Sequence, residues 1–211
     1  MKIMVIGANG RLGTILCREA CDRGHEVTAV IQSGEMREER LYQLWVRELF
    51  DLKREDVTPF DVVISAYGSN FMADAKSNRA AAEHLISICS KTPTRLLYVG
   101  SAGSLFTDKT HQKRVYETDG HPEYLREISI EMTRGLEAFE KSRHLEWCYL
   151  CPSLDFDYDG LRTGAVQIGG DEVLYGKNGK SRISYADFAA VLLDEAESGA
   201  HTGERITACV R

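Results

Sequence analysis

The chain has 211 residues, and its 32 acidic residues outnumber its 26 lysines and arginines, which gives a formal net charge of −6. The basic residues are scattered among the acidic ones, which argues against a nucleic-acid partner, since nucleic-acid surfaces need clustered Lys and Arg. The apolar run at residues 2–6 is far too short for a signal sequence or a membrane span. We therefore expect a cytoplasmic protein with no membrane partner, built as a single domain over residues 1–211.

Short apolar runs alternate with helical patterns along the chain, which is typical of a parallel sheet covered by helices on both faces. The first unit is a strand over 2–7, a helix over about 11–23 and a strand over 26–31. The fold class is therefore α/β, a Rossmann-type doubly wound and mainly parallel sheet of about seven strands, with a small substrate-side region at about 152–182. The elements expected after the first unit are a strand near 45–50, a strand over 61–66, a helix over 77–90, a strand over 95–99, a helix over about 122–142, a strand over 146–151, a helix over about 184–197 and a strand near 205–210.

Three glycines, Gly7, Gly10 and Gly13, stand between the first strand and the first helix. In this context Gly7 can make the tight turn, Gly10 lets the backbone approach a pyrophosphate, and Gly13 lets the helix pack on the strand. The helix N-terminus adds unpaired N–H groups and a partial positive charge. We therefore expect a nicotinamide dinucleotide here rather than an ordinary turn, in a crevice at the carboxyl ends of the first, fourth and fifth strands. The loop residues expected to contact the cofactor are Gly7, Asn9, Gly10, Arg11, Leu12 and Gly13.

The end of the second strand should decide which dinucleotide binds, because NAD-binding domains usually place an acidic residue there for the ribose 2′-OH. This chain has Gln32 and Ser33 instead, while Arg11 and Arg37 could meet a 2′-phosphate. We therefore expect NADP (NADPH) in preference to NAD, the alternative being that both arginines are ordinary solvated residues. Further cofactor contacts are expected where the fourth and sixth strands end, at Ala66, Tyr67, Gly68 and Pro152.

Cysteine and histidine positions argue against disulfides and metal. Of the six cysteines, Cys17 and Cys21 share a helix face, and Cys148 and Cys151 lie in a predicted buried strand, so we expect reduced thiols that fill the core. The six histidines show none of the spacings, with one another or with the cysteines, that are typical of zinc. The acidic run at 155–159 lacks the Gly and the closing Glu of a calcium loop. We expect no metal, and a solvated loop that borders the substrate pocket at this run.

Five segments carry a family resemblance that covers nearly the whole chain. They are residues 7–13, 61–66, 99–105, 162–164 and 181–189. Together they resemble stretches of the atypical short-chain dehydrogenase/reductases of the NmrA-like, NAD(P)-binding group. The chain is more distantly similar to the small flavin and biliverdin reductases of the same superfamily, and that similarity implies a reactive-site serine after the fifth strand, which matches Ser101. Bacterial members of the group often have Gly at that position, and Arg where this chain has Gln32.

The proton-transfer pair of ordinary short-chain dehydrogenases is absent. In those enzymes a Tyr moves the proton and a Lys four residues later lowers its pKa, but none of the nine tyrosines here is followed by Lys at that spacing. Hydride transfer needs only an oriented cofactor and acceptor, with a proton from solvent or a hydroxyl. We therefore expect Ser101 and Tyr124 as the catalytic residues; the alternatives are a small loop residue and a surface tyrosine. Other polar candidates around the nicotinamide are Tyr67, Ser104, Asn70 and His121.

Two functions remain open from the sequence. The first is an NAD(P)H-dependent oxidoreductase of the atypical short-chain type, which reduces a small carbonyl, quinone or flavin-like acceptor. The second is a non-catalytic NAD(P)-binding sensor or regulatory protein of NmrA-like type, which loss of the Tyr/Lys pair favours. Nucleotide-sugar epimerisation is disfavoured, because those enzymes generally carry the Tyr/Lys pair and a larger substrate domain. In each case the partner is a small molecule, and a monomer or homodimer is expected.

Overall fold

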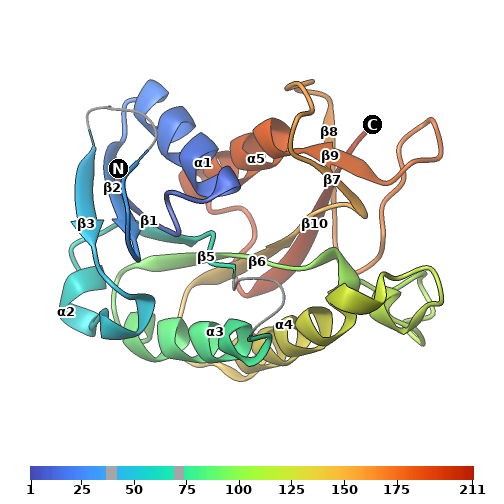
Figure 1. Ribbon diagram of the computed structural model, residues 1–211, viewed down its shortest axis with the longest axis horizontal. Coiled ribbons are helices and arrows are strands. Elements are labelled where there is room, and N and C mark those ends of the chain that lie inside the picture. The colour runs from blue at the N-terminus through green and yellow to red at the C-terminus, as the bar shows by residue number, and fades with distance from the viewer. Residues whose placement is uncertain (37–41, 69–73) are drawn as a thin grey trace.

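The computed structural model describes residues 1–36, 42–68 and 74–211. Its main feature is an eight-stranded sheet in the order β3-β2-β1-β4-β5-β6-β10-β8 (Figure 1). Of these strands β8 is antiparallel to its neighbour β10, and the other seven are parallel. The strands of this sheet are β1 (Lys2–Ile6), β2 (Glu26–Ile31), β3 (Gln43–Val46), β4 (Val62–Ser65), β5 (Arg95–Val99), β6 (Trp147–Cys151), β8 (Val166–Gly169) and β10 (Glu204–Val210). A separate two-stranded ribbon joins β7 (Asp155–Asp157) to β9 (Arg182–Ser184).

Helices cover both faces of the sheet. On one face α1 (Arg11–Asp22) packs beside α5 (Tyr185–Ser198), and on the other α3 (Lys76–Cys89) packs beside α4 (Glu123–Lys141) (Figure 1). The expected doubly wound, mainly parallel Rossmann-type fold is therefore confirmed. None of the described helices combines the length and the apolarity that crossing a bilayer requires. The short helical turns are η1 (Leu49–Asp51), α2 (Arg54–Val57), η2 (Ala102–Ser104) and η3 (Val115–Glu117).

The core lies in two layers because successive side chains of a strand point to opposite faces of the sheet. In β1, Ile3 and Val5 pack in the layer that contains residues of α1 and α5. Met4 packs in the other layer, together with residues of α3 and α4. Both faces of the central strands are thus apolar, which explains why they are continuous apolar runs in the sequence rather than alternating ones.

Both edges of the sheet differ from the sequence-based expectation. The strand expected near 45–50 lies at Gln43–Val46, and the chain then turns into η1. An eighth strand, β8, adds to the other edge, within the predicted substrate-side region. Edge strands bury less apolar surface, as Val46 (61% exposed) and Ile168 (44% exposed) show. Their sequences therefore carry a weaker pattern than those of the central strands.

The strand order reverses between β1 and β4, which are neighbours in the sheet although β2 and β3 separate them in the sequence. At their carboxyl ends the two chains stay paired, since the Ala66 amide donates to the carbonyl of Ile6 at 3.0 Å. The loop after β1 therefore faces the loop after β4 across a crevice, where ligands bind in open α/β sheets.

Candidate functional site

The loop between β1 and α1 leaves no room for side chains at two of its glycines. Gly7 has a φ of +76°, and a Cβ there would lie 2.8 Å from the carbonyl oxygen of Ala66. A Cβ at Gly13 would lie 2.1 Å from the Gly7 carbonyl oxygen, because the first turn of α1 packs directly on the loop. These two glycines have the turn and packing geometry that the sequence pattern predicts.

The first turn of α1 presents main-chain amides without a competing partner. Gly10 is the N-cap residue, and no side chain caps the helix there. The first turn contains no acidic residue. The amide groups of Arg11, Leu12 and Gly13, which have no carbonyl one turn earlier in the helix, are thus available to an anion together with the positive end of the helix dipole.

A cavity of about 360 Å³ opens beside this loop, at the carboxyl ends of β1 to β4. The side chain of Asn9 closes one corner of it by donating from Nδ2 to the carbonyl of Ser33 at 2.9 Å, which ties the glycine loop to the loop after β2. The predicted cofactor residues that line this cavity are Gly7, Asn9, Gly10, Gln32, Ala66, Tyr67 and Gly68. Arg37 and Asn70, also named from the sequence, lie outside the described residues.

Arg47 and Glu48 also line this cavity, and sequence reasoning missed both. The register of β2 with β3 pairs Ile31 with Val46, so Gln32 and Arg47 leave the sheet side by side. The guanidinium of Arg47 is held 2.6 Å from a carboxylate oxygen of Asp56 and lies over the ring of Trp45. In the sequence Arg47 and Glu48 are a charged pair directly after a short strand. Only the pairing of β2 with β3 shows that this strand ends beside Gln32. Further lining residues that were not predicted are Ile6, Val30, Leu49, Phe50, Asp74 and Ser77.

Five other predicted cofactor residues do not line the cavity, namely Arg11, Leu12, Gly13, Ser33 and Pro152. Arg11 is exposed at the start of α1, and its guanidinium carbon lies 4.9 Å from the ring centroid of Tyr158, on the loop after β7. Leu12 and Pro152 are both buried. Arg11 therefore stacks on an aromatic ring of the substrate-side region. The sequence suggested either a contact with a 2′-phosphate or an ordinary solvated residue, and neither interpretation predicts this stacking.

Ser101, directly beyond the carboxyl end of β5, begins a chain of polar side chains. Its Oγ accepts from the Gly103 amide at 3.1 Å and lies 3.3 Å from Oγ of Ser129. Ser129 Oγ lies in turn 3.2 Å from Nε2 of His121. Burial lowers the pKa of His121, and Arg126 adds to that shift. The structure thus brings together two candidates named from the sequence, Ser101 and His121, through a serine of α4 that was not named.

Tyr124 does not join this chain. It stands in the first turn of α4 with 65% of its surface exposed, and its side chain makes no hydrogen bond with another described residue. Its expected catalytic role stays a prediction. Ser104 is buried and supports Ser101, because its Oγ donates to the Ser101 carbonyl at 2.7 Å.

Two of the segments that carry the family resemblance meet at one carboxylate. Asp187, in the first turn of α5 and 1% exposed, accepts hydrogen bonds from the amides of Thr163 and Gly164 at 2.9–3.1 Å. The hydroxyl of Thr163 also donates to it, at 2.8 Å. Asp187 therefore ties the loop at 162–164 to the first turn of α5.

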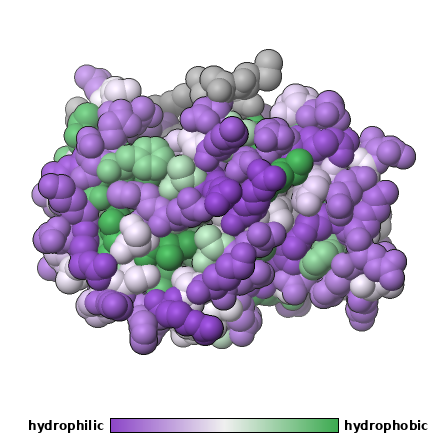
Figure 2. Space-filling model, turned by 90° about the horizontal axis from the view of Figure 1, so that it is seen from below, coloured by the Kyte–Doolittle hydropathy of each residue, from purple (hydrophilic) through white to green (hydrophobic). Residues whose placement is uncertain are grey.

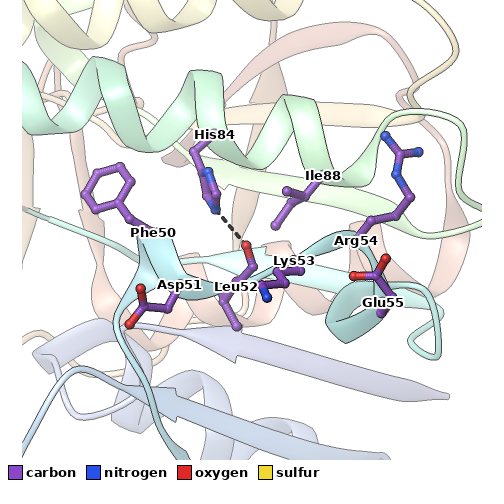
Figure 3. Close-up of a pocket in the computed structure, with 8 residues that line it drawn as sticks. All are labelled: Phe50, Asp51, Leu52, Lys53, Arg54, Glu55, His84 and Ile88. Atoms are coloured by element: carbon purple, nitrogen blue, oxygen red, sulfur yellow. Dashed lines mark hydrogen bonds between the residues drawn. The ribbon is translucent and has the colours of Figure 1, made fainter.

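A larger and more open hollow of about 650 Å³ lies between η1, α2 and α3, and Phe50 borders both it and the cavity described above. In Figure 3 the ring of His84 lies near Phe50, and its Nε2 is 3.0 Å from the carbonyl oxygen of Leu52. Figure 2 shows hydrophobic surface gathered in a hollow on this face, ringed by hydrophilic residues. Because its charged groups belong to the rim and do not converge on one point, we assign the chemistry to the cavity at the glycine loop.

Five of the six cysteines are buried. No disulfide joins any of the cysteines, and burial raises the pKa of Cys17, Cys89 and Cys148 to about 12. They therefore fill the core as reduced thiols, as expected. No group of three or more His, Cys, Asp or Glu side chains within 1–36, 42–68 and 74–211 could hold a metal ion.

Comparison with known proteins identifies the family. A family described as NAD(P)H-binding matches residues 7–198. The uncharacterised protein YwnB of Bacillus subtilis (strain 168) is 38% identical over 208 residues, which is 98% of this chain and 97% of that protein.

Solved structures agree with this assignment. A candidate NADH-flavin reductase from Streptococcus pneumoniae is 36% identical, with a TM-score of 0.93 and full coverage of both chains. A candidate epimerase from Bacteroides thetaiotaomicron is 30% identical, with a TM-score of 0.88 over 99% of this chain and 96% of that one. The resemblance to atypical short-chain dehydrogenase/reductase proteins is therefore confirmed.

Proposed function

Since the chain belongs to the NAD(P)H-binding family, we propose that it is an NAD(P)H-dependent reductase of a small carbonyl, quinone or flavin-like acceptor. The observation that carries the proposal is the seat at the glycine loop. The first-turn amides of α1 carry no side-chain cap, Gly7 makes the tight turn that precedes them, and a cavity lies beside this loop, between the loops after β1, β2, β3 and β4. A dinucleotide fits this arrangement, with the pyrophosphate on the amides and the adenosine in the cavity.

Ser101 supports catalysis rather than binding alone. When bound, the nicotinamide supplies a hydride, so the protein needs to orient the acceptor and to provide a proton. Ser101 stands at the end of β5, on the same edge of the sheet as the glycine loop, and its side chain is half-buried. The candidate NADH-flavin reductase with the same fold and 36% identity favours a flavin or similar acceptor.

We further propose NADP(H) as the preferred cofactor. Gln32 stands where an acid would bind the ribose diol of NAD, and Arg47 lies beside it on the wall of the cavity. Only one guanidinium nitrogen of Arg47 is engaged by Asp56, which leaves other N–H donors for a 2′-phosphate. Glu48 is the competing feature, because a carboxylate on the same wall suits a 2′-OH instead.

The test separates binding from turnover. Calorimetry with NADPH and NADH measures binding, and NADPH absorbance measures turnover with a panel of quinones, flavins and aldehydes. Gly10→Ala should bind NADPH at least about tenfold more weakly, because the second glycine lets the backbone approach the pyrophosphate. The loss of stability should be small, since the new Cβ would approach only the Gly7 carbonyl oxygen, at 3.1 Å. Gly170→Ala, in an open loop with nothing within 4 Å, is the matched control. Failure of the wild-type chain to bind either nucleotide would overturn the proposal.

The alternative is an NmrA-like sensor that binds NADP(H) without chemistry, which absence of the Tyr/Lys pair favours. The sensor hypothesis predicts that the wild type and Ser101→Ala both bind NADPH tightly and that neither oxidises it when an acceptor is added. The reductase predicts turnover that Ser101→Ala lowers. The proposal includes a cytoplasmic location, where NADPH is an available reductant. It also includes a monomeric or homodimeric state, which size-exclusion chromatography with light scattering measures.

A further inference from the structure

Three side chains from two parts of the chain form a continuous polar path at the carboxyl end of β5. Ser101 Oγ is 3.3 Å from Ser129 Oγ, and Ser129 Oγ is 3.2 Å from Nε2 of His121. Ser129 lies on α4, and His121 lies just before that helix. The proposed function uses Ser101 alone and leaves the rest of the path without a role.

We propose that His121 and Ser129 supply and orient the proton that Ser101 donates to the reduced acceptor, in place of the absent Tyr/Lys pair. The inference rests on the proposed reductase function. His121 and Ser129 are positioning residues, because they act on the acceptor through Ser101.

The hydrogen bonds around Ser101 fix the direction of this path. One lone pair of its Oγ is taken by the Gly103 amide at 3.1 Å. When His121 is protonated, Nε2–H must donate to Ser129, the Ser129 hydroxyl can then donate to Ser101, and the Ser101 proton is left for the acceptor. When Nε2 is unprotonated it can only accept, so the hydroxyls turn toward the ring and Ser101 has no proton to offer.

Burial keeps the middle of the path dry. Ser129 is 2% exposed. Gly103 covers it so closely that a Cβ there would lie 2.2 Å from Ser129 Oγ. Ser101 and His121, at the two ends, are both half-buried. Protons can therefore enter at the ring and leave at Ser101, while water cannot easily replace the serine between them.

The surroundings of His121 make its protonated form a ready donor. Burial lowers the pKa of the ring, a backbone group of Leu125 raises it, and the nearby charges of Arg126 and Glu123 act in opposite directions. From η2 the ring meets Gly103, which carries no charge. From η3 the Tyr116 carbonyl accepts from Arg126 and holds that charge in place. The imidazolium thus gives up its proton more easily than a solvated one.

The protons and electrons of the proposed reduction balance. A bound nicotinamide would supply two electrons and one hydrogen as hydride, for the new C–H or N–H bond of the acceptor. The oxygen or nitrogen of the acceptor takes the Ser101 proton, Ser101 takes the proton of Ser129, and Ser129 takes the Nε2 proton of His121. The ring is left neutral with its proton on Nδ1, and solvent protonates it again.

The experiment compares His121→Gln, Ser129→Ala and Ser101→Ala with His144→Asn, an exposed histidine at positive φ where Asn is well accommodated. Each of the first three should lower kcat by about 10²-fold with little change in KM or in calorimetric NADPH affinity. The double variant His121→Gln/Ser129→Ala should be no slower than either single variant, because the path acts as a unit. Wild-type kcat should fall as pH rises through the pKa of His121, and this limb should vanish in His121→Gln.

A second readout needs no cofactor. ¹⁵N NMR of the histidine rings should show Nε2 of neutral His121 unprotonated, with a shift that changes in Ser129→Ala while the other histidines stay as they are. A neutral ring that keeps its proton on Nε2, or a His121→Gln variant with wild-type kcat and pH profile, overturns the relay. Absence of NADPH binding in the wild type would instead overturn the reductase proposal, so the two failures are distinguishable.

Discussion

The guanidinium of Arg11 lies 4.9 Å from the ring centroid of Tyr158, and the two residues join regions far apart in the sequence. Arg11 is the first residue of α1, directly after the glycine loop. Tyr158 follows β7 and meets the ring of Tyr185 edge to face, with centroids 5.5 Å apart. The substrate-side region is thereby anchored to the helix that presents its amides to the proposed pyrophosphate.

Removal of the Tyr158 ring should weaken NADPH binding modestly. A cation–π contact at a partly exposed site contributes about 0.5–1 kcal/mol, so Tyr158→Ala should raise the Kd by about two- to fivefold. Tyr158→Phe keeps the ring and should bind like the wild type. Calorimetry on the three proteins gives the answer, and an equal loss in both variants would show that the hydroxyl matters instead of the ring.

Arg47 should determine the choice of dinucleotide. A charge-assisted hydrogen bond to a 2′-phosphate is worth about 1.5–3 kcal/mol, so Arg47→Gln should weaken NADPH by about tenfold or more and leave NADH unchanged. Glu48→Gln should leave NADPH binding intact. Asp56→Asn is the control, since it removes the ion-pair partner of Arg47 and keeps the arginine. An equal loss for NADPH and NADH in Arg47→Gln would contradict the assignment.

Asp187 should be essential for the stability of the substrate-side region. Asn in its place offers one acceptor oxygen and turns an NH₂ group toward the amides of Thr163 and Gly164, which have no other partner at that point. We expect Asp187→Asn to lower the free energy of unfolding by about 2–3 kcal/mol in urea titrations. Asp194→Asn, an exposed position on the same helix, should cost less than about 1 kcal/mol. Comparable losses in the two variants would mean that the buried carboxylate has no special role.

The sequence predicted the parts of the fold and the site that depend on local spacing. Gly7 and Gly13 were recognised because a strand, a tight turn and a helix follow one another within a dozen residues of chain. Arg47 was missed because its place beside Gln32 depends on the register of β3, a mostly exposed edge strand.

Contacts between distant segments could not be predicted from the sequence, for a similar reason. Ser101 and Ser129 meet only because α4 packs on η2. The contact of Arg11 with Tyr158 depends on a loop that carries no regular pattern. Periodicity and motif spacing report on neighbours along the chain, and these pairs are neighbours only after folding.

Arg95, at the start of β5, and Glu195, near the end of α5, form an ion pair that is almost fully buried. His201 completes it, with its amide 2.9 Å and its Nδ1 2.7 Å from the Glu195 carboxylate. Burial acts to raise the pKa of Glu195, but the hydrogen bonds from His201 and Arg95 outweigh it and hold the pKa below its usual value of 4.5. The folded state therefore favours the ionised form of Glu195. The resulting stabilisation is complete above the pKa that Glu195 has in the unfolded chain, and it is lost as the pH falls through the lower pKa of the folded state.

Glu195→Gln should lower the free energy of unfolding by about 3–5 kcal/mol at neutral pH, because Arg95 is left buried without a countercharge. This deficit should shrink as the pH falls below about 4.5, because the Glu195 carboxyl of the unfolded wild-type chain then takes up a proton while the folded one is still ionised. Urea titrations at neutral pH and near pH 3.5 measure both values, with Glu140→Gln on the exposed surface of α4 as the control. A deficit that is independent of pH would show that the variant loses packing rather than charge.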